Sequence, residues 1–200
     1  MKINDSIIIS DNVLSSEDFQ LLKSYCINEA KFEAVEKGDN IYIVAKPPQE
    51  IEQKILQTLQ EIYHKQIDVS ISFLRIANSK IDINWRIHCD NTNVAGKFNP
   101  THGAIFYITH DKNNINGTAF WRHKKYGYVC PDNFTNEEIQ NKIIVDREDS
   151  MKWDVSTIIG GVENRMVSYP AKYFHSKYPR VMQGKDINDS RIILALFYKI

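Results

Sequence analysis

Two side chains that could bind a metal stand two residues apart in the segment NWRIHCD, where His88 is followed by Asp90. In an extended strand, residues i and i+2 point to the same face, so both side chains leave one side of the backbone. His175, in YPAKYFHSKYP, is a candidate third ligand just beyond a predicted strand that ends at Tyr169 and Pro170. Two imidazoles and one carboxylate on one side of an ion leave three coordination positions open, which suits non-haem iron(II).

A short combination such as H-x-D arises by chance in many chains, so a second feature has to support the metal site. Arg191 provides it, because it opens the apolar segment SRIILALFY, which we predict to be a strand on the inner surface of a barrel. A buried arginine needs an anionic partner, since an unpaired buried charge is very costly. The planar guanidinium matches a carboxylate through two parallel hydrogen bonds.

Taken in order, His88, Asp90, His175 and Arg191 resemble the 2-oxoglutarate and iron(II)-dependent oxygenase superfamily. HCDN followed by AIFYIT is similar in particular to its prolyl-4-hydroxylase-like branch, and the match spans residues 70–198 through HCDN, GTAFWRH, NRMVSYPAKYFH and SRIILALFY. The resemblance implies a double-stranded β-helix, the jelly roll also found in cupins, with iron(II) held by His88, Asp90 and His175. It also implies that Arg191 and Tyr107 bind the co-substrate 2-oxoglutarate.

The reaction implied by the resemblance couples decarboxylation of 2-oxoglutarate to succinate with hydroxylation of a C–H bond, with dioxygen as the second co-substrate. A prolyl side chain in a protein or peptide is the first substrate that we expect, and a free small molecule is the second. A non-catalytic metal-binding β-barrel, acting as a sensor or binding module, is the alternative from another functional class. A zinc hydrolase on the same barrel is also compatible with the three ligands, but it gives Arg191 no role.

The spacing of the arginine departs from the resemblance. Arg191 lies 16 positions after His175, more than is common in the prolyl hydroxylases, so Arg180 is a competing anchor for the co-substrate. We prefer Arg191 because it begins a strand, whereas Arg180 follows Pro179 in a polar loop and is expected to be solvated.

The elements that must position these residues are two helices followed by strands. The apolar residues recur with the helical period over residues 15–30, where Ser15 is the expected N-cap, and over residues 48–66. The period then changes to two, and we predict strands at 67–77, 83–90, 103–109, 117–122, 153–159, 164–169 and 190–198. This order favours a mainly β sandwich or barrel with the N-terminal helices packed on one outer face.

We expect one domain over residues 1–200, with helical support at 15–66 and a barrel core at 67–198. A polar insertion at 124–150, with a short helix near residues 137–142, interrupts the strands and is expected to act as a lid or substrate-selecting loop. The four other histidines are expected to have structural or surface roles: His64, His102, His110 and His123. The three tryptophans, Trp85, Trp121 and Trp153, are expected to pack in the barrel.

The composition bounds the remaining classes of function. The 25 basic and 25 acidic residues cancel, which disfavours the electrostatic binding of nucleic acid. No stretch approaches the roughly 20 apolar residues of a membrane span. Three scattered cysteines, Cys26, Cys89 and Cys130, suit free thiols in a reducing cytoplasm, where we expect the protein. The oligomeric state stays open.

Overall fold

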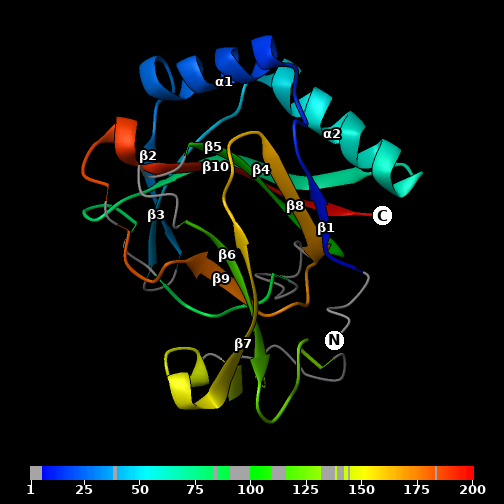
Figure 1. Ribbon diagram of the computed structural model, residues 1–200, viewed down its shortest axis with the longest axis vertical. Helices are drawn as coiled ribbons and strands as arrows, with labels where there is room; N and C mark the ends of the chain where they lie inside the picture. Colours follow the sequence, from blue (N-terminus) through cyan, green and yellow to red (C-terminus); the bar gives the residue numbers. More distant parts are fainter. Residues whose placement is uncertain are drawn as a thin grey trace.

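Two antiparallel sheets lie face to face in the computed structural model (Figure 1), which describes the chain except residues 1–5, 38–39, 83–84, 91–99, 110–115, 132–137, 139–141, 144 and 183. The large sheet has the strand order β1-β8-β5-β10-β4-β3-β2, and the small sheet has the order β7-β6-β9. The strands are β1 (Ile8–Ser10), β2 (Glu33–Lys37), β3 (Asn40–Ala45), β4 (Asp68–Ala77), β5 (His102–Thr109), β6 (Gly117–His123), β7 (Trp153–Gly160), β8 (Arg165–Pro170), β9 (His175–Tyr178) and β10 (Arg191–Lys199).

The central strand β10 shows how the large sheet separates two environments. Side chains alternate across a strand, so Ile193 and Ala195 pack into the space between the sheets, together with Phe120 of β6. Ile192 and Leu194 point the other way, into a core shared with the helices. Two layers of sheet around one interior are consistent with the expected jelly roll.

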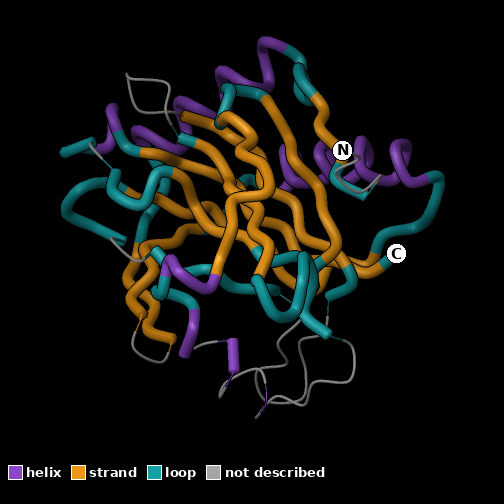
Figure 2. Tube along the Cα trace, turned by 60° about the horizontal axis from the view of Figure 1, so that its bottom comes forward, coloured by secondary structure: helices purple, strands orange, loops and turns teal. Residues whose placement is uncertain are grey.

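The two helices α1 (Ser16–Asn28) and α2 (Gln49–Tyr63) lie over the outer face of the large sheet (Figures 1 and 2). Helix α1 begins where predicted, because the Ser15 hydroxyl accepts a hydrogen bond from the Asp18 backbone N–H at 3.1 Å. Helix α2 ends before the predicted residue 66, because His64 takes a left-handed conformation at φ 51° and closes the helix. The apolar stripe of α2 packs on the sheet through Ile51, Ile55 and Leu59.

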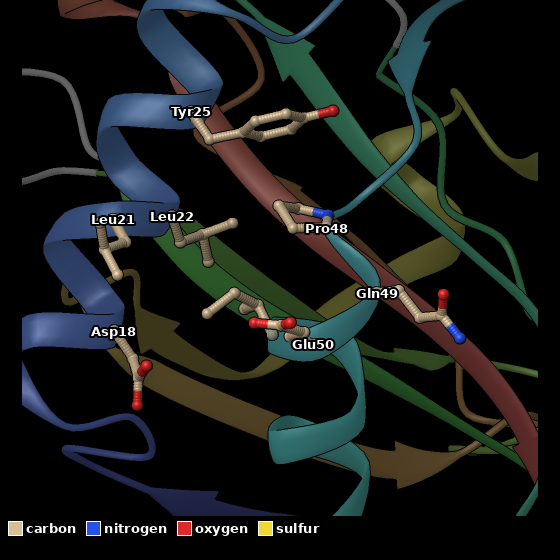
Figure 3. A pocket seen from close by; sticks show the side chains of 8 residues that line it. Asp18, Leu21, Leu22, Tyr25, Pro48, Gln49 and Glu50 are labelled. Carbon is tan, nitrogen blue, oxygen red and sulfur yellow. The ribbon is translucent and has the colours of Figure 1, made fainter.

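A surface groove separates the two helices on this outer side (Figure 3). It is lined by Leu21, Leu22 and Tyr25 of α1, with Asp18 at one end, and by the residues that begin α2, namely Pro48, Gln49, Glu50 and Ile51. The large sheet lies between this groove and the space enclosed by the two sheets.

The seven predicted strands correspond closely to observed elements, with one exception. Within predicted strand 83–90, residues 83–84 lie outside the described part, and only His88 forms a β-bridge. Strands β1, β2, β3 and β9 were not predicted. The helix expected near residues 137–142 falls largely on residues that the structure does not describe. Among the described residues, no helix is long and apolar enough to cross a membrane.

Adjacent leucines of α1 test how much the helix contributes to the core. Leu22 is fully buried, whereas Leu21 is 60% exposed. We expect Leu22→Ala to lower the free energy of unfolding by about 2–5 kcal/mol, since it leaves a cavity against the sheet. Leu21→Ala, which removes the same atoms from the same helix, should change it by no more than about 0.5 kcal/mol. Urea unfolding measures both, and equal losses would show that α1 does not pack as described.

Candidate metal and carboxylate-binding site

The three predicted metal ligands meet because two distant segments pair through their backbones. The His88 N–H donates to the His175 carbonyl at 3.0 Å, and the His175 N–H donates to the His88 carbonyl at 2.9 Å. The Asp90 N–H donates to the carbonyl of Ala171 at 2.6 Å. The segment that carries His88 and Asp90 thus continues the small sheet beside β9, and its ligands face the same interior as His175.

The ligand atoms form a tight cluster. The Nε2 atom of His88 lies 3.6 Å from Oδ1 of Asp90, and the Nε2 atom of His175 lies 3.3 Å from Oδ2 of Asp90. One ligand atom from each residue falls within 4.8 Å of the others. Nitrogen and carboxylate ligands bind divalent metals at about 2.0–2.2 Å, so a single ion placed among the three fits this spacing. The donor set is the two-histidine, one-carboxylate face that suits iron(II).

Both imidazoles are oriented by the same local bond. Nδ1 of His88 lies 2.9 Å from the Arg86 carbonyl, and Nδ1 of His175 lies 2.9 Å from the Tyr173 carbonyl. A carbonyl can only accept, so each Nδ1 carries the proton and each Nε2 presents its lone pair to the cluster. Desolvation of the ring within the cluster, with the neighbouring His175, lowers the pKa of His88 to about 4, although part of the side chain is exposed. Its ring is therefore in the neutral form that binds metals.

The side chains of His88, Asp90 and His175 differ in their exposure. The Asp90 and His175 side chains are 8% and 4% exposed, whereas 48% of the His88 side chain is exposed. The cluster is therefore reached by solvent from the side of His88, and the other two ligands face the interior.

Tyr169 is a fourth polar group at the cluster that the sequence did not reveal. Its hydroxyl donates to Oδ2 of Asp90 at 3.2 Å and lies 3.1 Å from Nε2 of His175. The side chain is 2% exposed. Burial, with the charge of Asp90, raises the pKa of Tyr169 well above its ordinary value, so the phenol is neutral at pH 7.

Arg191 lies deeper in the same interior and lacks an anionic partner among the residues that the structure describes. It is 3% exposed, and its Nη2 makes one long contact of 3.4 Å with the Gly117 carbonyl. Its Nε has no hydrogen-bond partner in the described part of the chain. Burial lowers the pKa of Arg191. This orphaned donor is what a bound carboxylate would satisfy.

Tyr107, the other predicted co-substrate residue, lies beside Arg191. The guanidinium carbon of Arg191 stands 5.6 Å from the centre of the Tyr107 ring, and the Tyr107 hydroxyl bonds Thr118 Oγ1 at 2.6 Å. Arg180, the competing anchor, is exposed, with its guanidinium carbon 4.9 Å from the Trp85 ring centre, so it is not buried in the interior as Arg191 is.

Two further polar residues of this region were missed from sequence. Asn116 is 1% exposed, and neither its amide nitrogen nor its oxygen has a hydrogen-bond partner among the described residues. Lys177, which is 9% exposed, donates to the backbone carbonyl of Asp82. Burial lowers the pKa of Lys177 to about 8. The register of β6 on β9 sets Lys177 beside Thr118, which in turn bonds Tyr107.

The Asp82 carboxylate is paired with an arginine. It forms a two-point ion pair with Arg75, with Nη2 of Arg75 2.8 Å from Oδ1 of Asp82 and a second, shorter bond from Nε. Arg75, Lys177 and Arg191 are thus three cations close enough to influence one another's ionisation. The interior therefore offers unneutralised positive charge to a ligand.

Parts of the 124–150 insertion pack on the outer face of the small sheet. Ile143 is fully buried in a cluster with Trp153 and Phe174, and the Trp153 ring N–H donates to the Asp146 carbonyl at 2.8 Å. His123 bonds Asp146 at 3.1 Å, as a structural histidine would. Much of the insertion lies outside the described residues, and its action as a lid stays a prediction.

No family model and no curated protein matches the sequence, but solved structures share its fold. The non-heme alpha ketoglutarate dependent epimerase SnoN from nogalamycin biosynthesis has a TM-score of 0.63 at 10% identity, over 97% of this chain and 78% of SnoN. HygX from Streptomyces hygroscopicus, solved with nickel, 2-oxoglutarate and hygromycin B bound, gives 0.54 at 12% identity over 96% and 82%. The viral collagen prolyl hydroxylase vCPH from Paramecium Bursaria Chlorella virus-1 gives 0.52 at 10% identity over 98% and 96%.

Substitution of the ligands tests the metal cluster. We expect His88→Ala and His175→Ala each to lose most of the affinity for iron(II), because two remaining ligands do not define the three-ligand face. Asp90→Ala is less decisive, since a buffer anion can replace the carboxylate. His102→Ala is the matched control, since His102 lies outside the cluster and bonds the Thr101 hydroxyl at 3.0 Å. Anaerobic titration calorimetry measures the affinity, and full iron occupancy in either histidine variant would contradict the assignment.

Proposed function

We propose that this chain is a non-haem iron(II) dioxygenase that couples oxidative decarboxylation of 2-oxoglutarate to oxidation of a substrate C–H bond, commonly its hydroxylation. One observation carries the proposal. A cluster of three metal ligands lies between the two sheets, together with a buried arginine that has no anionic partner among the described residues.

The spacing of residues along β9 fits a dicarboxylate that reaches from the metal ligands to the buried cations. His175 and Lys177 are two residues apart on one face of β9, which separates them by roughly 7 Å along the strand. A five-carbon keto acid that chelates the metal at one end would carry its second carboxylate to about this depth. Arg191, Lys177 and the Asn116 amide would there supply donors to that carboxylate, with Tyr107 beside them.

The residues of the chain then have distinct tasks. His88, Asp90 and His175 would hold the iron. When bound, the iron would activate dioxygen, with 2-oxoglutarate as the co-substrate that is oxidised. Arg191 and its neighbours would orient the co-substrate so that its keto-acid end meets the metal. The apolar walls from Phe120, Val167 and Ile193 exclude water from the interior.

The substrate side of the proposal is supported by two kinds of neighbour. SnoN has been solved in complex with nogalamycin RO and HygX with hygromycin B, and both of these ligands are small molecules. The viral neighbour vCPH is a collagen prolyl hydroxylase, in line with the prolyl side chain suggested by the sequence resemblance. The exposed side of His88 is where either substrate would approach.

Formation of succinate separates this proposal from a non-catalytic metal-binding barrel. Iron-loaded protein with 2-oxoglutarate and dioxygen should form succinate, and a substrate should increase the yield. A prolyl peptide and hygromycin B can be compared directly as such substrates. Stable binding of both iron and 2-oxoglutarate with no succinate under air would favour the sensor alternative.

Arg191 gives the sharpest quantitative prediction. Removing it leaves the far carboxylate unpaired in a buried site, so Arg191→Ala should weaken 2-oxoglutarate binding by about 2–5 kcal/mol, or roughly 30-fold to several-thousand-fold. Iron affinity should barely change. Arg191→Lys should recover part of the loss, because an ammonium cannot form two parallel hydrogen bonds.

Arg180→Ala is the matched control for this measurement, because Arg180 is an exposed arginine and the competing anchor suggested by the sequence. Its removal should alter 2-oxoglutarate affinity by no more than about 1 kcal/mol. Titration of 2-oxoglutarate into each iron-loaded variant without oxygen decides the matter. A large loss for Arg180→Ala beside a small loss for Arg191→Ala would reverse the assignment.

A further inference from the structure

Tyr169 places a phenol hydroxyl at the metal cluster from a strand that carries none of the three ligands. Strand β8 alternates at this point. Ser168 faces the helices, where its hydroxyl bonds those of Tyr63 and Tyr198 at 2.6 Å each, and Tyr169 faces the interior beneath Asp90 and His175.

The backbone opposite Tyr169 is shaped to admit this ring. Gly103 of β5 is its partner in register, and a Cβ atom at Gly103 would lie 3.1 Å from Oδ2 of Asp90 and 3.2 Å from the Tyr169 ring. These separations are tighter than ordinary van der Waals contact. Glycine at this position therefore lets the phenol and the carboxylate meet at the wall of the barrel.

The distances set the hydroxyl beside the first coordination sphere of an ion in the cluster. Two ligands on neighbouring positions of an ion with bonds of about 2.0–2.2 Å stand about 3 Å apart, and the Tyr169 oxygen lies 3.1 Å from Nε2 of His175 and 3.2 Å from Oδ2 of Asp90. The phenol could thus act as a fourth ligand or as a hydrogen-bond donor to Asp90.

The second role agrees with the rest of the site. A fourth protein ligand would occupy one of the three positions that a chelating keto acid and dioxygen require between them. As a donor, the phenol instead occupies Oδ2 of Asp90 and leaves Oδ1 for the ion, because an oxygen that accepts a hydrogen bond has less lone-pair density to give to a metal. Binding through one oxygen keeps all three positions open.

We propose that Tyr169 is a positioning residue of the metal site, whose hydroxyl donates to Oδ2 of Asp90 and thereby limits this carboxylate to one metal-bound oxygen. The inference rests on the proposed metal site. It adds a group to that site from β8 and explains why Gly103 stands opposite.

The test compares wild type, Tyr169→Phe and Tyr198→Phe after loading with cobalt(II), whose visible absorption reports its coordination. Tyr169→Phe removes one oxygen and keeps the ring, so the fold should persist, which thermal unfolding verifies. It should bind cobalt(II) roughly 10- to 100-fold more weakly, because Asp90 loses the hydrogen bond that orients it, and the absorption band should change because the carboxylate no longer presents one fixed oxygen. Tyr198→Phe, which removes a buried hydroxyl on the other side of the same sheet, should match wild type in affinity and spectrum.

The alternative outcomes separate this inference from the proposed function. An unchanged affinity and spectrum in Tyr169→Phe would overturn the positioning role and leave the metal site standing. A strong visible band from phenolate bound to iron(III), present in wild type and lost in Tyr169→Phe, would also overturn it, because Tyr169 would then be a direct ligand. Failure of wild type to bind either metal would refute the metal site and the role of Tyr169 together.

Discussion

The reciprocal pair of backbone hydrogen bonds between His88 and His175 is the interaction on which the site depends. These residues are far apart in the chain, and each donates to the carbonyl of the other. The pairing fixes not only how close the two segments come but also their register. A slip by one residue would turn His88 and Asp90 to the outer face and replace them by Cys89. The pairing therefore brings the three ligands to one face, where the local hydrogen bonds of each side chain set its orientation.

Alternation across the strands then assigns each side chain to one of two environments. On β10, one face joins the helices through Ile192, Leu194 and Leu196, and the other faces the small sheet through Ile193 and Ala195. The buried polar groups of the site, Tyr169, His175 and Arg191, lie on this inner face, where little water reaches them and their hydrogen bonds are stronger. The helices stabilise the large sheet from behind without contributing a residue to the cluster.

The residues whose chemistry depends on their spacing could be predicted from the sequence. His88 and Asp90 share a face because they are two residues apart. Arg191 is a candidate anion-binding residue because it begins an apolar strand. The same two-residue rule would have found Lys177 from His175, but β9 has only four residues and no apolar alternation to mark it as a strand. Tyr169 was recognised only as the end of a strand, since the face to which it points depends on the register with Gly103.

Other features could not be predicted because their cause is tertiary. Asn116 carries no local signal, and its importance lies in being buried without partners among the described residues. Strand β1 is three residues long and is held by its pairing with β8, too short for a period to be recognised. The β2 segment EAVEK is largely charged and exposed, and such residues have a weak intrinsic preference for strands. It forms a strand because it pairs with β3, which the sequence does not reveal.

The buried cations give the last step from structure to selectivity. Arg191 and Lys177 are buried charges, which lower the stability of the fold unless they are well paired, and the nearby Asp82 carboxylate forms its ion pair with Arg75 rather than with either of them. A ligand that brings negative charge to this depth relieves that cost and stabilises the folded chain in proportion to its concentration. A keto acid with one carboxylate could chelate a metal at His88, Asp90 and His175, yet it would leave the deeper cations unpaired. The buried positive charge of Arg191 and Lys177, which lowers stability when no ligand is bound, would therefore favour a dicarboxylate over an acid with one carboxylate.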